Sequence, residues 1–133
     1  MALATLGSVV LDCPDPRALA AFYAEVLGGK VTLYAEEPGG STVETEGAAD
    51  WVVLRLPDGQ ELAFQSAPGH VPPRWPSQDG SQQFHLDLTV ENLDAAEKEV
   101  LALGAKVLDA EDQKRTWRVY ADPAGHPFCL CAS

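Results

Sequence analysis

The sequence predicts an α+β fold in which two β-α-β-β-β modules form one curved, eight-stranded mixed sheet, an open barrel with its helices outside. The first observation is a repeat between residues 17–31 and 93–107. Both segments carry a leucine, a glycine, a lysine and a valine at equivalent positions, 76 residues apart, as Leu27 and Leu103 are. The second is a repeat between residues 51–64 and 117–130. Here a tryptophan, a valine, a proline and a glycine recur at equivalent positions 66 residues apart, as Trp51 and Trp117 do. One module has too little apolar area to be stable alone, so we expect the two to pack together.

The fall in offset from 76 to 66 means that the first module carries about ten more residues than the second (76 − 66 = 10). We place these residues in the Gly-, Ser- and Glu-rich stretch 36–50. We expect a single domain over residues 1–133, with module 1 at about 5–67, module 2 at about 82–132 and a Pro-rich linker at 68–81.

The first module is expected to begin with an alternating strand at about residues 6–13. Asp15 followed by Pro16 is typical of a helix N-cap and first turn, apolar side chains then recur at helical spacing, and Gly28 ends the helix. Three short strands follow, and the tight turn Pro-Asp-Gly at 57–59 joins two of them.

The second module repeats this order. An alternating strand at about residues 83–90 precedes Asn92, which is a good N-cap for a helix that ends before Gly104. Three more strands are expected after the helix. The Pro-Ala-Gly turn at 123–125 corresponds to the Pro-Asp-Gly turn of the first module.

Composition favours a soluble protein that binds neither nucleic acid nor membranes. Nine basic and 20 acidic residues give a net charge of −11, which repels phosphate groups. No apolar run approaches the roughly 20 residues that span a bilayer, and residues 1–5 lack the features of a signal peptide. We therefore expect a cytoplasmic protein. Its three cysteines have no framework spacing and are expected to be reduced.

Alternation along the strands separates an apolar face, expected to lie under the helices, from a polar face. The apolar set is Val9, Leu11, Leu62, Phe64, Leu86, Leu88, Phe128 and Leu130. The polar set is Ser8, Asp12, Glu61, Gln65, His85, Asp87 and Thr89. A polar sheet face is either simply solvated or lines a cleft in which its side chains orient a ligand.

The sequence resembles the vicinal oxygen chelate superfamily, which includes glyoxalase I, bleomycin-resistance proteins and extradiol dioxygenases. The resemblance covers nearly the whole chain and is closest to the glyoxalase-like branch. It rests on DPRALAAFYAEVLG at 15–28, NLDAAEKEVLALG at 92–104, DPAGHPFCL at 122–130, PPRWP at 72–76 and QQFHLDL at 82–88. The resemblance implies the two-module fold described above, with the polar face lining a concave cleft. Because this fold supports unrelated chemistries, it does not imply one activity.

Metal-using members of the superfamily place one ligand on the first and one on the last strand of each module. The resemblance assigns these positions to Ser8, Ala63, His85 and Cys129. Alanine has no donor atom and a serine hydroxyl is a poor ligand, whereas catalytic zinc sites normally use about three protein ligands. We therefore expect no metal and no other cofactor. A shifted divalent-metal site of His85, Glu61 and Cys129 is the alternative.

His85 is the residue most strongly indicated as functional, because it combines a polar sheet face with a superfamily ligand position. Asp87 projects from the same face, so the two could act as a proton-transfer couple or be an exposed pair without a task. Trp51 and Trp117 are related by the repeat and serve either a shared packing role or as an aromatic wall. Trp75 suits a pocket rim or a subunit contact. The other residues expected to line a ligand site are Ser8, Asp12, Gln65 and Cys129.

Two classes of function are consistent with these features. The first is a small-molecule-binding protein of the glyoxalase and bleomycin-resistance type with a degenerate metal site, for example one that binds a natural product and confers resistance. The second is a lyase or isomerase in which His85 acts as acid or base and Asp87 orients it. The resemblance also implies a homodimer. A true glyoxalase or dioxygenase is disfavoured by Ser8 and Ala63.

Overall fold

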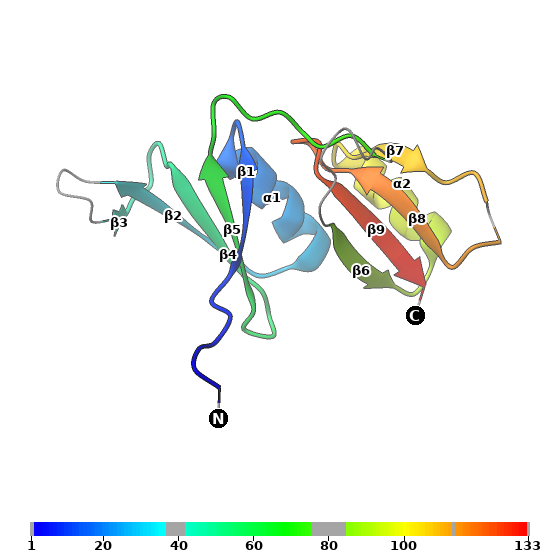
Figure 1. Ribbon diagram of the computed structural model, residues 1–133, viewed down its shortest axis with the longest axis horizontal. Helices are drawn as coiled ribbons and strands as arrows, with labels where there is room; N and C mark the ends of the chain where they lie inside the picture. The colour runs from blue at the N-terminus through cyan, green and yellow to red at the C-terminus, as the bar shows by residue number, and fades with distance from the viewer. Residues whose placement is uncertain (1, 37–41, 76–84, 113, 133) are drawn as a thin grey trace. The chain divides into compact units, whose positions relative to one another are not determined.

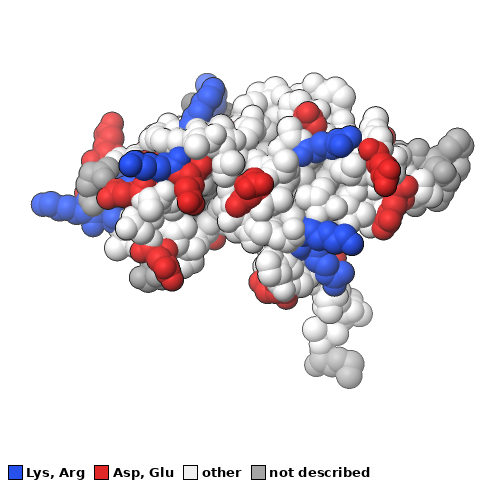
Figure 2. All heavy atoms as spheres, turned by 180° about the vertical axis from the view of Figure 1, so that it is seen from behind, with Lys and Arg blue, Asp and Glu red and all other residues white. Residues whose placement is uncertain are grey.

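A computed structural model describes residues 2–36, 42–75, 85–112 and 114–132 and divides the chain into two compact units after His70 (Figure 1). In each unit, one helix packs against one face of a small mixed sheet. Lys and Arg side chains are interspersed among Asp and Glu on the surface shown in Figure 2. On this face the two signs are therefore mixed.

The first unit contains one helix and a five-stranded sheet in the order β1-β5-β4-β2-β3. Strand β1 is parallel to β5, and the remaining neighbours are antiparallel. The elements are β1 (Val9–Cys13), α1 (Pro16–Leu27), β2 (Lys30–Glu36), β3 (Thr42–Glu44), β4 (Trp51–Arg55) and β5 (Glu61–Ser66).

Helix α1 begins and ends where its capping residues predict. The Asp15 side chain accepts a hydrogen bond from the Ala18 amide at 3.2 Å, which satisfies one of the unpaired N–H groups of the first turn. The helix ends at Gly28. The next residue, Gly29, has a φ of +103°, and a Cβ there would lie 2.3 Å from the Arg55 carbonyl oxygen. Only glycine therefore allows the chain to pass from α1 into β2 so close to β4.

The core of the first unit lies between α1 and the sheet. Tyr23 of α1 is fully buried and stacks on Phe64 of β5 with 5.9 Å between ring centroids. Phe22 meets Tyr23 edge-on at 4.9 Å. Val52 and Leu54 of β4 complete this layer and are also fully buried. Burial of these large apolar side chains is the main favourable contribution to folding of the unit.

The second unit contains one helix and a four-stranded sheet in the order β6-β9-β8-β7, with β6 parallel to β9. The other two pairs are antiparallel, and the β7–β8 pair has a register shift between Val107 and Asp109. The elements are β6 (Leu86–Val90), α2 (Leu93–Ala102), β7 (Lys106–Asp109), β8 (Trp117–Ala121) and β9 (Pro127–Ala132).

Backbone geometry shows that the two units repeat the same hairpin. In the first, the Leu56 amide donates to the Gln60 carbonyl and the Gly59 amide to the Leu56 carbonyl, at 2.8 and 2.9 Å. In the second, the Asp122 amide donates to the His126 carbonyl and the Gly125 amide to Asp122, at 2.9 and 2.8 Å. The flanking strands also pair in the same register, since Trp51 faces Gln65 and Trp117 faces Cys131.

The α+β fold of two related modules, with one helix in each, is confirmed. The strands differ in one respect from the expected single sheet of eight: the described residues contain nine strands that pair as two separate sheets, not closed into a barrel. The ninth strand is β3, which falls in the stretch 36–50 where the extra residues were placed. Part of the expected linker and of the strand at 83–90 lies outside the described residues, in 76–84.

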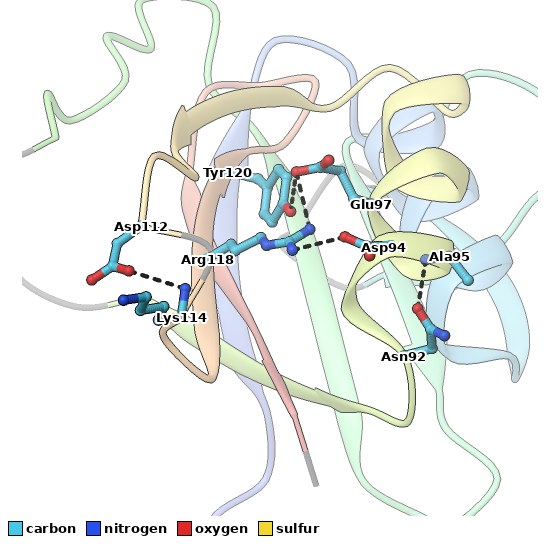
Figure 3. A network of polar contacts seen from close by, with 8 residues as sticks. All are labelled: Asn92, Asp94, Ala95, Glu97, Asp112, Lys114, Arg118 and Tyr120. Carbon is cyan, nitrogen blue, oxygen red and sulfur yellow. Dashed lines mark hydrogen bonds and ion pairs between the residues drawn. The ribbon is translucent and has the colours of Figure 1, made fainter.

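The helix of the second unit is held by a polar network around the buried Arg118 and Tyr120, in addition to apolar packing (Figure 3). Val100 is the buried apolar residue of α2. Arg118 lies under the helix, and its Nη2 donates to Asp94 Oδ1 at 2.8 Å. Tyr120 Oη donates to Glu97 Oε1, also at 2.8 Å. The hydrogen bond with Asp94 raises the pKa of Arg118 above its usual value, and burial raises the pKa of Tyr120.

We expect Arg118→Ala to lower the free energy of unfolding by about 3 kcal/mol, because it removes a buried side chain together with the partner of two carboxylates. Asp94→Ala should cost less than about 1 kcal/mol, since the Asp94 side chain is 83% exposed and water replaces the lost hydrogen bond. Chemical denaturation followed by circular dichroism measures both values. Equal losses for the two variants would contradict a structural role for the buried guanidinium.

Candidate functional site

The candidate site lies on the face of the second sheet that points away from α2. Arg118 and Tyr120 of β8 contact the helix, so the alternate residue, Val119, points to the other face. Val119 pairs with Cys129 of β9, and Cys129 pairs with Asp87 of β6. Paired residues on neighbouring strands share a face, so these three side chains form a row on the side opposite to the helix.

His85 and Asp87 are in direct contact on this face. His85 immediately precedes β6, and its Nε2 lies 3.1 Å from Asp87 Oδ1. The two side chains are 31% and 66% exposed, so the pair is open to solvent and to a ligand. Donor atoms of His85, Asp87 and Cys129 all lie within 4.8 Å of one another. The arrangement combines an imidazole, a carboxylate and a thiol in one small volume.

Trp75 closes one side of the His85 ring. Its indole meets the imidazole edge-on, with 5.4 Å between ring centroids and 85° between planes. The segment that carries Trp75 packs on the β8–β9 turn, where a Cβ on Gly125 would lie 2.4 Å from Pro72 Cβ. Because Gly125 lacks a side chain and has a φ of +91°, the turn admits Pro72 at this distance. This contact positions Trp75 beside His85.

The thiol of Cys129 is kept in its neutral form. Burial raises its pKa to about 12, and the negative charge of Asp87 acts in the same direction. Burial also raises the pKa of Cys131, the next thiol on this face. All three cysteines are reduced in the structure. A protonated, buried thiol is a poor nucleophile, which argues against a covalent mechanism at Cys129.

A second aromatic group stands on the same face, two residues along β8 from Val119. Trp117 pairs with Cys131 and is 37% exposed, and the Arg115 guanidinium lies 4.0 Å from the centre of its ring. Asp109 holds the guanidinium through two contacts at 2.8 and 3.3 Å. Sequence reasoning missed Arg115. It lies in the connection between β7 and β8, outside the aligned repeat, and no local pattern marks it.

The remaining residues expected at the site belong to the first unit. Asp12 pairs with Gln65, and Gln65 pairs with Trp51, so these three form a row on the face opposite to α1. Ser8 immediately precedes β1 on the same face as Asp12. The expected residues therefore form two groups, one in each unit: Ser8, Asp12, Trp51 and Gln65 in the first, and Trp75, His85, Asp87, Trp117 and Cys129 in the second.

The four positions that the superfamily resemblance assigns to metal ligands fall two in each unit, Ser8 and Ala63 in the first and His85 and Cys129 in the second. Ala63 is fully buried, has no donor atom, and pairs with Val10. Glu61, the third ligand of the alternative shifted site, lies in the first unit. In the second unit, however, Asp87 lies beside His85 and Cys129 and adds a third donor that the sequence did not assign to a metal. The donors present suit zinc rather than magnesium or calcium.

Comparison with known families identifies the chain. The sequence profile of the glyoxalase-like domain matches residues 8–131. The chain belongs to the glyoxalase-like domain family. The profile spans both modules, so the repeat and the family assignment describe the same part of the sequence. A comparison with curated proteins finds no significant match.

Several solved structures share this glyoxalase-like fold. The fosfomycin resistance protein FosX from Listeria monocytogenes superposes with a TM-score of 0.66 at 13% identity, covering 99% of this chain and 93% of that one. A glyoxalase/bleomycin resistance/dioxygenase family enzyme from Burkholderia phytofirmans PsJN gives 0.63 at 19% identity, covering 97% and 98%. The antibiotic binding protein TnmS3 from Streptomyces sp. CB03234 gives 0.60 at 17% identity, covering 99% and 98%. At these identities the similarity establishes the fold.

No helix in the described part of the glyoxalase-like domain is long and apolar enough to cross a membrane. The longer of the two helices, α1, has 12 residues, against the roughly 20 that a bilayer requires.

We expect Cys129 of the native protein to resist alkylation. With its pKa at about 12, the thiolate fraction at pH 8 is about a thousandfold below that of a thiol with the usual value of 9.0. Between pH 9 and 12 the unfolded thiol ionises while the folded one stays protonated, so this group contributes stability below pH 9 that is lost as pH rises towards 12. Timed iodoacetamide labelling with peptide mass analysis, native against unfolded, measures the protection. Rapid native labelling at Cys129 would contradict it.

Proposed function

We propose that the glyoxalase-like domain binds a small organic ligand on the face that carries His85. The observation that carries the proposal is the His85–Asp87 pair, which is open to solvent, 3.1 Å apart, and bounded by the Trp75 indole. A ligand placed there would meet a polar, hydrogen-bonding pair next to an aromatic surface. Binding sites for small molecules combine these two features: apolar area for affinity and a few placed polar groups for orientation.

Trp117 and Arg115 extend this face and indicate what part of a ligand it would accept. The stacked guanidinium offers both a flat surface and a positive charge, although Asp109 balances much of that charge. A ligand with a planar ring and a polar or weakly acidic substituent would use both aromatic groups. Two structural relatives are named as a fosfomycin resistance protein and an antibiotic binding protein, which agrees with an antibiotic as the ligand.

A role in natural-product binding or resistance is the specific form of the proposal. It is supported by the incomplete superfamily metal set, in which Ala63 provides no donor, because a protein that only binds its ligand does not need that set. The expected homodimer and cytoplasmic location stay predictions from the sequence.

A panel of planar antibiotics titrated against tryptophan fluorescence tests ligand binding. We expect a saturable change for at least one compound, because Trp75 and Trp117 stand on the proposed face. His85→Ala and Trp75→Ala should each weaken that binding by about tenfold or more, the effect of losing a contact of about 1–3 kcal/mol. His70→Ala, a histidine variant in the first unit, serves as the control and should bind normally. A panel without any saturable response, or equal binding by all variants, would refute the proposal.

The contact between His85 and Asp87 also favours a second function, a lyase or isomerase. With the Nε2 hydrogen directed at Asp87 Oδ1, 3.1 Å away, a neutral imidazole would carry its lone pair on Nδ1. Nδ1 would then remove a proton from a carbon or hydroxyl group of the ligand and return it to another atom. Asp87 would keep the ring in this tautomer and stabilise the imidazolium formed.

Steady-state kinetics on any compound found in the ligand screen distinguish binding from catalysis. If the domain is an enzyme, Asp87→Asn should lower kcat by about a hundredfold with little change in KM, because the amide no longer stabilises the imidazolium. His85→Gln should abolish proton transfer while it keeps part of the binding. Full turnover by His85→Gln would exclude this mechanism.

A further inference from the structure

We propose that His85, Asp87 and Cys129 form a zinc-type metal site contained in the second unit. The site goes beyond ligand binding, because it does not require that any organic molecule occupy this face. It also differs from the metal arrangement implied by the superfamily resemblance, which takes two ligands from each module. Here all three donors come from β6, the residue before it, and β9.

The distance between His85 and Asp87 is close to what a tetrahedral ion requires, and the Cys129 thiol lies near both. Nitrogen and oxygen ligands bind zinc at roughly 2.0–2.1 Å and a thiolate at roughly 2.3 Å, so at tetrahedral angles an N–O pair lies roughly 3.3 Å apart and an N–S pair roughly 3.6 Å. His85 Nε2 and Asp87 Oδ1 are 3.1 Å apart. The whole set, Cys129 Sγ included, lies within 4.8 Å. A small closure of the side chains would complete one triangular face of the tetrahedron.

Rigid elements hold each of the three donors. Asp87 and Cys129 are direct register partners in the parallel β6–β9 pair, so the backbone sets the separation of their Cβ atoms. His85 is one residue outside the strand, but its ring packs against Trp75. Metal sites built on strands with supported ligand orientations lose little freedom when the ion binds.

The first unit shows that the fold itself does not need these polar residues. The pair Val10 and Ala63 occupies the same register position in β1 and β5 that Asp87 and Cys129 occupy in β6 and β9. Ser8 stands before β1 as His85 stands before β6. The same parallel strand pair therefore forms with apolar side chains. Comparison with the first unit therefore shows no structural reason for a thiol, a carboxylate and an imidazole to lie together in the second unit.

The donor set determines which ions the site would take. A thiolate and an imidazole favour zinc and its borderline neighbours cobalt and nickel, whereas magnesium and calcium require oxygen ligands. Among the described residues, this is the one group of three His, Cys, Asp or Glu side chains with donor atoms so close together. Three protein ligands leave the fourth position of a tetrahedral ion open to water or to a donor atom of a bound molecule.

Metal binding and the direct contact between His85 and Asp87 exclude each other. An ion held by Nε2 and Oδ1 would leave no proton between these two atoms, and Cys129 would bind it as the thiolate, with its proton given up to solvent. The ion-free protein therefore presents the His85–Asp87 pair to a ligand, and the loaded protein would present an open coordination position instead. One face would have two chemically distinct states, set by the availability of the ion.

Cobalt substitution of the full chain tests the site. Protein stripped with a chelator and kept reduced is titrated with Co²⁺ in the absence of any organic ligand. We expect about one ion per chain, a near-ultraviolet charge-transfer band from the thiolate, and the intense visible bands of four-coordinate cobalt. Added zinc should abolish both sets of bands. Binding of one Co²⁺ per chain without the thiolate band would overturn the proposal. Failure of the protein to bind one equivalent of Co²⁺ would overturn it as well.

Matched variants assign the ligands. Cys129→Ser should lose the charge-transfer band, whereas Cys131→Ser, two residues along the same strand, should keep it. His85→Ala and Asp87→Asn should each weaken Co²⁺ binding by tenfold or more, with circular dichroism confirming that the variants are folded. The reverse pattern for the two cysteines would refute the site.

Repeating the antibiotic titration on stripped and zinc-loaded protein separates the proposals. Unchanged cobalt spectra without antibiotic binding would refute ligand binding and leave the metal site intact.

Discussion

The parallel hydrogen-bond ladder between β6 and β9 determines which side chains meet at the candidate site. Its register places Asp87 beside Cys129, and the residue before β6 places His85 within 3.1 Å of the same carboxylate. A shift of β6 by one residue would turn His85 and Asp87 to the opposite face, under α2, and leave Cys129 without either partner. The chemistry of the second unit therefore depends on a backbone interaction, and the side chains supply only the donor types.

The two units use the same backbone plan with different core chemistry. Val52 and Leu54 of β4 are buried under α1, whereas Arg118 and Tyr120 occupy the corresponding positions of β8 and bind carboxylates of α2. Buried charged groups cost more to desolvate than apolar ones, but they require a particular partner in a particular place. This network orients α2 through hydrogen bonds, where α1 relies on the packing of aromatic rings.

The sequence predicted interactions between residues that are close in the chain, and it did not predict those between distant residues. Asp15, Gly28 and the turn at 57–59 act within a few residues, so their helix ends and hairpin were predictable, and the repeat extended them to the second unit. The alternation of side chains also predicted the face that carries His85 and Asp87. The row that joins Asp87 to Cys129 was not predictable, because register depends on a strand 42 positions later (87 and 129). Arg118 was missed for the same reason, because its partner Asp94 lies 24 positions away in the sequence, whereas Arg115 binds Asp109 six positions away in a connection that carries no recognisable pattern.

The close approach of Pro72 to Gly125 links the surroundings of His85 to a turn that contains none of the donors. Any side chain at position 125 would overlap the proline ring and displace the backbone that leads to Trp75. The indole would then withdraw from the imidazole, and the histidine would gain rotational freedom and water. The environment of the site could thus be adjusted from a distance, through one steric contact, with every chemical group of the site left in place.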